Sequence, residues 1–330
     1  MKIVQFKTPG PPSVLEYVDV PTPEPKRGEV LVRAEAIGIG MPDVMIRRGV
    51  YNWMPPLPTA PGTEMSGTIE KLGAGVTRFR IGQRVVVSAR DRPVRGGCYA
   101  EYNATPEDSV YALPDGADMD QAAALANYQV AYHLLYDCIT FKPGQSVLVQ
   151  GAAGGTGSAL LDLAQSAGLE VIGLCSGAAK IDFVKSFGVT QVIDRQRGDI
   201  GEAVKAVTGG KGVDYIMDFA GGPDFAKNFA MLAPYGTVVS YGQLAGKPPG
   251  DVYGALRAQA AKNLALRVFS IHIYDHWREP MQTGMRRLIE KLGRGEIRPR
   301  IYDRLPLAEA QRAHELFESG RVMGKLLLRP

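Results

Sequence analysis

The residues best suited to chemistry form a glycine-rich turn between an apolar strand and a helix. The segment from Val147 to Gly157 reads VLVQGAAGGTG, and an apolar helical pattern follows it. Such a turn lets the backbone approach a diphosphate closely, because a Cβ would collide with the ligand, and the first N–H groups of the helix point at the anion. The spacing G-x-x-G-G-x-G differs from the common G-x-G-x-x-G, so the prediction of dinucleotide binding rests on the strand–turn–helix context. The residues assigned to this cofactor site are Gly151, Ala152, Ala153, Gly154, Gly155, Thr156 and Gly157.

The residues after the next expected strand, 170–174, indicate which dinucleotide binds. A site for NAD carries Asp or Glu about 20 residues beyond the turn, where it holds the ribose 2′-hydroxyl. Here the stretch Leu174–Lys180 contains no acid. Lys180 could pair with a 2′-phosphate, Ser176 could donate a hydrogen bond to it, and Arg195 follows the third strand, where a second cation could join. We therefore expect NADP(H), although Lys180 could also be an ordinary exposed helix residue.

Cysteine and histidine offer little for a disulfide framework or a metal site. The three cysteines, at positions 98, 138 and 175, are widely spaced and form no C-x-x-C pair. An odd, scattered set is typical of a reducing compartment. His272 and His276 have the spacing of two ligands on a helix, but no third ligand accompanies them. We expect no metal.

The N-terminal part of the chain reads as β-structure broken by Pro and Gly. We expect strands at residues 2–6, 29–37, 64–72, 83–88, 98–104 and 110–113. From Met119 on, a helix at 119–140 is followed by strands that alternate with helices. The expected strands of this part are 146–150, 170–174, 192–194, 213–218, 237–241 and 264–270. The helices between them are expected at 156–167, 178–187, 200–207, 224–232 and 253–262. This alternation indicates a doubly wound parallel sheet of six strands.

The last part of the chain is too short for a core of its own. It holds expected helices at 280–293 and 307–319 and an apolar strand at 325–328, and we expect it to return to the N-terminal β domain. The predicted domains are therefore residues 1–118, completed by 271–330, and residues 119–270. The apolar strand 264–270 would lie at an edge of the parallel sheet, and an unpaired apolar edge is a liability.

Length and composition agree with a globular protein of two domains. The chain has 330 residues, of which 45% are apolar and 22% charged, and its net charge is +4. No basic run interleaved with aromatic residues indicates nucleic-acid binding. The N-terminus lacks a signal-peptide pattern, and no apolar run approaches the length of a membrane span. We expect a cytoplasmic protein that binds neither nucleic acid nor membrane.

Short motifs spread along the whole chain are specific when taken together. They are Gly49–Tyr51, Pro61–Glu64, Gly73–Val76, Gly82–Val85, Gly97–Tyr102, Gly151–Gly157 and Gly324–Leu328. In these motifs the sequence resembles the medium-chain dehydrogenase/reductase superfamily, in its zinc-independent, zeta-crystallin-like quinone oxidoreductase branch. The resemblance implies a GroES-like β-rich catalytic domain, a Rossmann domain with the six-stranded sheet and an active site in an interdomain cleft. It also implies a homodimer that pairs the sheet edges at 264–270.

The resemblance also implies site residues. It places Asp43 and Tyr51 near the nicotinamide, where Tyr51 could donate a hydrogen bond to a carbonyl oxygen that gains charge, or could simply pack in its loop. Many relatives have Asn at the position of Met41, so Met41 suggests a more apolar substrate pocket. Trp53 could stack on a flat substrate or belong to the core. The further residues assigned to the cofactor are Gln129, Tyr241, Gly242 and Lys325.

The zinc-containing members of the superfamily have ligands that this chain lacks. They carry Cys and His in the segment equivalent to Gly40–Asp43, a Gly-His-Glu motif, and often a four-cysteine lobe. Here those places hold Met41, Asp43 and Thr63, and no cysteine cluster follows. Zinc needs three or four N, S or O ligands, so we expect chemistry without zinc.

Three functions remain open from the sequence. The first is NADPH-dependent reduction of quinones, which needs hydride donation and a proton that solvent can supply. The second is reduction of a carbon–carbon double bond conjugated to a carbonyl, as in an enoyl or 2-alkenal reductase. Both acceptors build charge on an oxygen. The third, from another class, is a non-catalytic NADP-binding protein.

Overall fold

The computed structural model describes all 330 residues and divides into two compact units. Unit 1 comprises Met1–Ala126 and Asp275–Pro330, and unit 2 comprises Asn127–Tyr274. The sequence predicted divisions after residues 118 and 270. The first division falls later because helix α2 (Met119–Ala122) packs in unit 1, where the Ser66 hydroxyl donates a hydrogen bond of 2.7 Å to the Met119 carbonyl.

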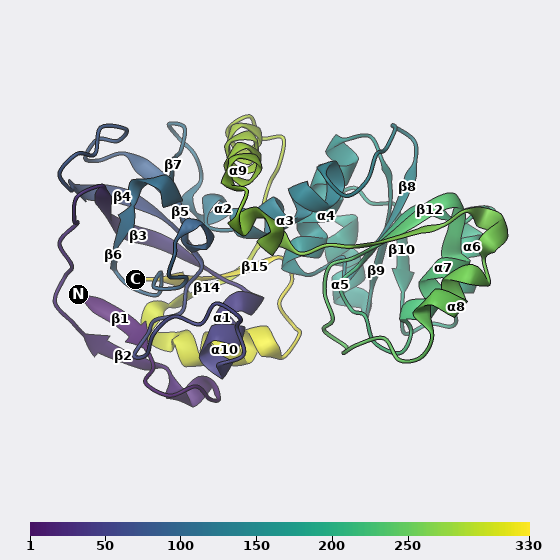
Figure 1. Ribbon diagram of the computed structural model, residues 1–330, viewed down its shortest axis with the longest axis horizontal. Helices are drawn as coiled ribbons and strands as arrows, with labels where there is room; N and C mark the ends of the chain where they lie inside the picture. Colours follow the sequence, from purple (N-terminus) through teal and green to yellow (C-terminus); the bar gives the residue numbers. More distant parts are fainter. The chain divides into compact units, whose positions relative to one another are not determined.

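Unit 1 is built on a seven-stranded sheet with the order β14-β15-β3-β4-β5-β7, and β6 pairs with β3 (Figure 1). Every pairing is antiparallel except that of β14 with β15. These strands are β3 (Glu29–Ile39), β4 (Glu64–Leu72), β5 (Arg84–Ser88), β6 (Tyr102–Pro106), β7 (Val110–Ala112), β14 (Ile301–Pro306) and β15 (Lys325–Arg329). A separate hairpin-like sheet pairs β1 (Lys2–Gln5) with β2 (Glu16–Asp19).

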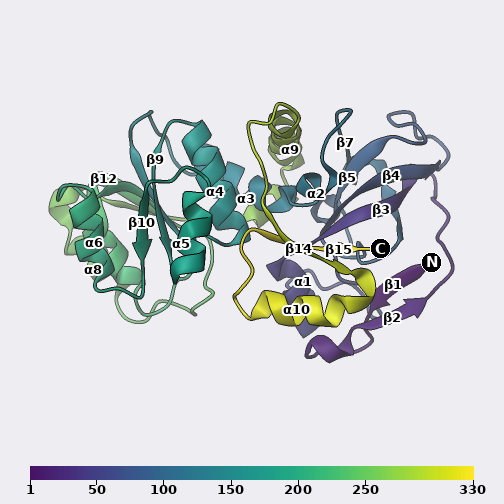
Figure 2. The ribbon, with the colours of Figure 1, turned by 180° about the vertical axis from the view of Figure 1, so that it is seen from behind.

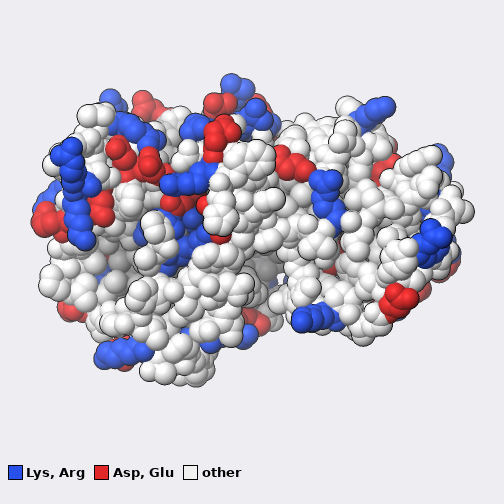
Figure 3. Space-filling model, in the orientation of Figure 1, with Lys and Arg blue, Asp and Glu red and all other residues white.

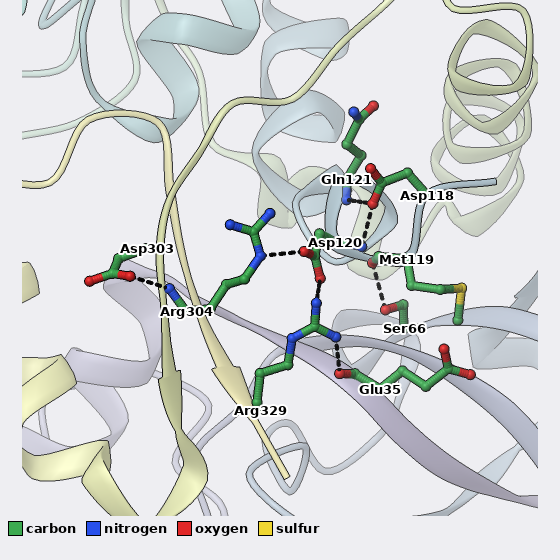
Figure 4. Close-up of polar contacts among 9 residues, drawn as sticks. All are labelled: Glu35, Ser66, Asp118, Met119, Asp120, Gln121, Asp303, Arg304 and Arg329. Carbon is green, nitrogen blue, oxygen red and sulfur yellow. Dashed lines mark hydrogen bonds and ion pairs between the residues drawn. The ribbon is translucent and has the colours of Figure 1, made fainter.

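The end of the chain lies inside this sheet, between β14 and β3. Leu326, Leu327 and Leu328 of β15 are fully buried, which explains why an apolar strand at the C-terminus leaves the other unit for this core. The Asp120 carboxylate of α2 binds arginines of both β14 and β15 (Figure 4). Asp120 of α2 accepts from Arg304 Nε of β14 at 2.5 Å and from Arg329 of β15, and Arg329 also donates to the Glu35 carbonyl at 2.6 Å.

Three helices of unit 1 complete the core. Helices α9 (Arg278–Gly293) and α10 (Ala310–Glu318) match the two expected near the end of the chain. Helix α1 (Met41–Arg48) was not expected from the sequence, because it has only eight residues and lies among proline-rich loops. It ends at Gly49, whose φ of 72° is in the left-handed region that glycine adopts without strain.

Unit 2 is a six-stranded, all-parallel sheet with the order β10-β9-β8-β11-β12-β13. Its strands are β8 (Ser146–Gln150), β9 (Glu170–Cys175), β10 (Gln191–Asp194), β11 (Val213–Asp218), β12 (Leu232–Ser240) and β13 (Ala265–Val268). Helices α4 (Gly155–Ser166) and α5 (Ala178–Lys185) cover one face. The other face carries α6 (Ile200–Val207), α7 (Asn228–Met231) and α8 (Val252–Arg257), as Figures 1 and 2 show. The predicted α/β fold class, a β-rich domain with a doubly wound parallel sheet of six strands, is confirmed.

Several expected helices are shorter than the sequence suggested. The single helix expected at 119–140 breaks at Ala123 and continues as α3 (Leu125–Tyr136). The helix expected at 224–232 is a 3-10 turn followed by α7, and β12 begins directly at Leu232. Apolar spacing showed that helices lie here but could not show where the chain turns within them.

No helix in the chain is long and apolar enough to cross a bilayer. On the face drawn in Figure 3, basic and acidic side chains are interspersed.

Candidate functional site

The glycine-rich turn lies where β8 ends and α4 begins. Gly154 is the N-cap of α4, with extended backbone, and no side chain caps the helix. The N–H groups of the first helical turn therefore point away from the end of α4 without a side-chain acceptor, as an anion-binding turn requires. Thr156 Oγ1 lies 3.2 Å from the Asn127 side-chain nitrogen, which donates to it and fixes its rotamer.

The glycines of the turn are needed for two different reasons. A Cβ on Gly157 would lie 2.1 Å from the Gly151 carbonyl oxygen, and one on Gly151 would lie 2.4 Å from the Phe219 ring. These two glycines are thus required by the protein's own packing, whereas the sequence argument had assigned all of them to ligand approach. A Cβ on Gly154 would meet only the Gly151 carbonyl oxygen, at 3.3 Å. Gly154 is thus the least constrained of these three glycines by the protein's own packing.

The end of β9 carries the residues expected to select the dinucleotide. Ser176 and Lys180 are half-buried and Arg195 is exposed. The Arg195 N–H donates to the Cys175 carbonyl at 2.8 Å, which holds the ends of β9 and β10 together. Asp194, which the sequence argument did not consider, also lies here. Its Oδ1 accepts weakly from the Gly177 N–H, at 3.4 Å.

Asp194 and Lys180 carry opposite charges, and both lie near Cys175 at the carboxyl end of β9. Burial and then the Asp194 carboxylate raise the pKa of the Cys175 thiol and the Lys180 ammonium lowers it, with a net value of about 11. Asp194 has a cation of its own, since Arg197 Nε lies 3.4 Å from its Oδ2. The signal that could have found Asp194 is its position as the last residue of a parallel strand next to β9.

The neighbouring parallel strands β8, β11 and β12 bring their carboxyl ends to the same edge of the sheet. Asp218, at the end of β11, is buried and accepts from the Gly221 N–H and the Asn228 side chain, both at 2.8 Å. Gly242, assigned to the cofactor, could not carry a Cβ, which would lie 2.5 Å from the Phe219 carbonyl oxygen. Tyr241 lies half-buried beside Phe219, with ring centroids 6.5 Å apart.

Gln129 is buried in helix α3 of unit 2. Lys325, also assigned to the cofactor, lies in β15 of unit 1 and is buried at 4% exposure, where its ammonium pairs with Glu64.

Asp43 is completely buried in unit 1 and has two backbone donors. Its Oδ2 accepts from the Gly40 N–H at 2.7 Å, which caps helix α1, and its Oδ1 accepts from the Gly62 N–H at 3.1 Å. Burial raises the pKa of Asp43 to about 6, while the two N–H groups and nearby Lys325 lower it. Glu64 is the third charged residue of this cluster. Its Oε1 pairs with the Lys325 ammonium, and its Oε2 accepts from the Ala126 N–H at 2.7 Å.

Tyr51 lies in a second cluster of unit 1, around a buried arginine. Arg95 is 5% exposed and donates from Nη1 to the Tyr51 hydroxyl at 3.2 Å. Its Nη2 pairs with Asp275 at 2.5 Å, and its guanidinium lies over the Trp53 ring, 4.7 Å from the centroid. The Tyr51 and Trp53 rings are 5.7 Å apart. Because arginine can only donate, the Tyr51 oxygen is the acceptor of this bond, and the hydroxyl proton points elsewhere.

Comparison with known proteins supplies the family. The model of the alcohol dehydrogenase GroES-like domain matches residues 26–115, and the zinc-binding dehydrogenase model matches residues 155–290. A quinone oxidoreductase of Pseudomonas aeruginosa is 33% identical over 330 residues, which cover 100% of this chain and 99% of the relative. The synaptic vesicle membrane protein VAT-1 homolog of Mus musculus is 33% identical, over 93% of this chain and 78% of that protein. The solved structure of Escherichia coli quinone oxidoreductase complexed with NADPH aligns with a TM-score of 0.87 and 31% identity, over 100% of each chain.

The chain belongs to the quinone oxidoreductase branch of the medium-chain dehydrogenase/reductase superfamily. The family predicted from the motifs is thereby confirmed. In the present chain, no group of three or more His, Cys, Asp or Glu side chains is arranged so that it could hold a metal ion. Met41, which stands at a zinc-ligand position of other members, is 40% exposed at the start of α1.

Sequence reasoning missed the charged residues around Tyr51 and Asp43. Arg95 and Asp275 are far apart in the sequence and follow no motif, so only the fold brings them together. Glu64 was recognised as part of a motif, but its pairing with Lys325 could not be read from the sequence.

Proposed function

We propose that this protein is an oxidoreductase that uses NADPH to reduce quinones, without zinc. The observation that carries the proposal is the uncapped glycine turn at the start of α4, where a Cβ on Gly154 would meet only the Gly151 carbonyl oxygen, at 3.3 Å. Relatives named quinone oxidoreductase along the full chain, one of them solved with NADPH, support the same reading. Residues 174–180 contain no acid, which favours a 2′-phosphate at Lys180 over a free 2′-hydroxyl.

The residues of unit 2 would bind and orient the cofactor. The first N–H groups of α4 would hold the diphosphate, and Ser176, Lys180 and Arg195 would hold the 2′-phosphate. Gln129, Tyr241 and Gly242 would line the nicotinamide end. When bound, NADPH supplies the hydride.

The residues of unit 1 would act on the acceptor. Reduction places negative charge on the acceptor's carbonyl oxygen, and a hydroxyl aimed there stabilises the transition state more than the ground state. Tyr51 is suited to this role, because Arg95 occupies its oxygen as a donor and directs its proton away. Trp53 and Met41 would form apolar walls for a flat substrate.

For Asp43 the geometry supports a positioning role. Both carboxylate oxygens are bound by backbone N–H groups, so Asp43 would fix the loops at Gly40 and Gly62. Lys325 and Glu64 would neutralise each other, so the Asp43 carboxylate would depend on its two backbone N–H donors.

We further infer a cytoplasmic homodimer that needs no metal, with no role for nucleic acid or membrane. The scattered cysteines, all three unpaired and buried, support a reducing compartment. Strand β13 supports the dimer, since it forms an edge of the sheet and carries Val268 with 79% exposure.

The test is NADPH oxidation measured across a panel of quinones and conjugated enones, before and after dialysis against a strong chelator. We expect oxidation with quinones that survives the chelator. A protein that reduces enones and no quinone would be the enone reductase that the sequence left open. Failure to oxidise NADPH with any acceptor, together with tight NADPH binding, would indicate a non-catalytic binding protein. Zinc present in equal amount to the protein and lost together with activity would overturn the metal-free proposal.

A further inference from the structure

Strands β8 and β11, which are parallel neighbours in unit 2, are joined twice at their carboxyl ends. The Asn228 amide lies between their last residues, because its Nδ2 donates to Asp218 at 2.8 Å and its Oδ1 accepts from Gln150 Nε2 at 2.9 Å. The residues that follow are packed so closely that a Cβ on Gly151 would lie 2.4 Å from the Phe219 ring. Gly151 is the first residue of the glycine turn, so this second contact links the end of β11 to the turn.

The Asp218 carboxylate fixes the loop that leads out of β11. Asp218 is 1% exposed, and its Oδ1 accepts from the Gly221 N–H at 2.8 Å. The loop bends through Gly221 and Gly222, whose φ values of 61° and 68° are in the left-handed region. A buried carboxylate is costly without hydrogen bonds. Here both oxygens have donors, so the carboxylate and the loop hold one another in place, and Phe219 lies within that loop.

Phe219 contacts the residues after two different strands. Its ring lies against Gly151 after β8, and its carbonyl oxygen lies where a Cβ on Gly242, after β12, would be only 2.5 Å away. The Tyr241 N–H donates to the Asp218 carbonyl at 2.8 Å, which ties the end of β12 to the same place. The residues assigned to the two ends of the cofactor are thus packed on one side chain and its backbone.

Gly151 depends on this support because a glycine has many other conformations open to it. Its φ is 60°, and its carbonyl oxygen accepts from the Gly154 N–H at 2.9 Å. Phe219 therefore restrains Gly151 directly and the start of α4 through that hydrogen bond. A turn that is ordered before its ligand arrives binds the ligand more tightly, since less conformational entropy is lost on binding.

We propose that Asp218 is a positioning residue for the cofactor: by holding Phe219 against Gly151, it keeps the glycine turn in the conformation that receives the diphosphate. The inference rests on the proposed function in one respect, namely that this turn binds the diphosphate. Neither Asp218 nor Phe219 is among the residues proposed above to contact the cofactor, and both would act through the packing of the turn.

The first experiment measures dinucleotide binding to Asp218 variants by fluorescence titration. We expect Asp218→Ala to weaken NADPH and NADH binding by the same factor, about tenfold, because the diphosphate is common to both. Asp218→Asn keeps the size of the side chain, and the Asn228 and Gln150 amides can reverse to pair with it. It should bind both dinucleotides nearly as tightly as the unmodified protein does.

Asp214→Ala is the matched control, because Asp214 joins the same two strands at their amino ends. Its carboxylate accepts from the Ser146 N–H at 2.8 Å and from the Ser146 hydroxyl at 2.9 Å. We expect this variant to lower the thermal midpoint and to leave both affinities unchanged. An equal loss of affinity in Asp214→Ala would show that the effect of Asp218 is one of stability alone, and would overturn the inference.

Phe219→Ala tests the route by which Asp218 acts, and it also serves if Asp218→Ala does not fold. It removes the ring from Gly151 but no group that is hydrogen-bonded to the Asp218 carboxylate. We expect a loss of about tenfold for both dinucleotides, and little further loss when Asp218→Ala is added. The inference is overturned by unchanged affinity in Phe219→Ala, by additive losses in the double variant, or by a loss in Asp218→Asn as large as that in Asp218→Ala.

Steady-state kinetics separates this inference from the proposed function. With a quinone as acceptor, we expect Asp218→Ala to raise the KM for NADPH about tenfold and to change kcat little. NADPH binding that depends on Asp218, without oxidation by any quinone, would leave the inference standing and overturn the reductase. Quinone reduction with the same KM for NADPH in Asp218→Ala and in the unmodified protein would do the reverse.

Discussion

Two charged residues of opposite sign border the end of β9, and they make the choice of cofactor testable at the level of single residues. Lys180→Ala removes the cation proposed to bind the 2′-phosphate. We expect it to weaken NADPH binding by about 1–3 kcal/mol and to change NADH binding little, because NADH lacks that phosphate. Fluorescence titration with both dinucleotides measures the two affinities.

A second variant tests the same site by removing its negative charge instead of its positive one. Asp194→Asn removes a carboxylate that lies beside Gly177 and should, if anything, favour NADPH. Equal affinity of the unmodified protein for NADH and NADPH would refute the assignment, whatever the variants show.

Tyr51 is the residue on which the proposed chemistry depends most. Tyr51→Phe keeps the ring beside Trp53 and removes only the hydroxyl. Loss of one donor to a developing oxyanion can cost on the order of 10²-fold in rate. We expect a lower kcat, little change in NADPH affinity, and a larger loss for enones than for quinones, since an enolate depends more on the donor than an aromatic hydroquinone does. Steady-state kinetics with one acceptor of each class measures these effects.

Arg95 provides the control for that prediction. If Arg95 acts by orienting the Tyr51 hydroxyl, Arg95→Gln should lower kcat in the unmodified background and add little in the Tyr51→Phe background. Additive losses would assign Arg95 to packing. An unchanged kcat in Tyr51→Phe for both acceptors would make Tyr51 a packing residue.

At the level of elements, α10 is held on the sheet of unit 1 by a buried histidine. His314 is fully buried, its Nε2 lies 3.0 Å from the Tyr99 hydroxyl oxygen, and burial together with the Arg47 charge lowers its pKa to about 3. The unfolded chain takes up this proton near the ordinary pKa of 6.5, whereas the folded protein resists it until about pH 3. Protonation therefore favours the unfolded state, and stability falls as the pH is lowered between those values.

The direction of this pH dependence can be tested by replacing His314 in α10. His314→Gln removes the titrating group, so the free energy of unfolding should decline less steeply from pH 6.5 towards pH 3, by up to about 1.4 kcal/mol per pH unit. Urea unfolding at a series of pH values measures the difference. His276→Gln, at an exposed histidine, should keep the slope of the unmodified protein. Identical slopes in all three proteins would show that His314 does not govern acid stability.

Some helices and strands could be predicted from the sequence, and others could not. Strands β4, β8 and β11 lie at the residues that alternation and apolar runs predicted, because buried strands depend on local pattern. Helix α1 and strand β14 were missed, since one is short and proline-flanked and the other is mostly exposed. The glycine turn was recognised from its context between an apolar strand and a helix. The partners of Tyr51 and Asp43 were not, because Arg95, Gly62 and Lys325 reach them only through tertiary structure.

At the scale of the whole molecule, the open question is how the sheet edge at β13 is covered. An apolar strand with an exposed edge invites pairing with another chain, and a second copy can pair with it symmetrically about a twofold axis. The other edge, β10, ends instead in Asp194 with Arg197 beside it, a charged arrangement that discourages pairing. The dimer proposed from the sequence is thus specific to one edge of unit 2.

A charge placed on that edge should therefore separate the copies. Val268 is 79% exposed in the single chain and would be buried in a paired edge, so Val268→Lys brings two like charges together and leaves them poorly hydrated. We expect the unmodified protein to sediment as a dimer and Val268→Lys as a monomer with an unchanged thermal midpoint at low concentration. Val207→Lys, at a 36% exposed apolar position on α6 of the same unit, should remain dimeric. A monomeric unmodified protein would remove the dimer, and a dimeric Val268→Lys would contradict an interface that buries Val268 at the end of β13.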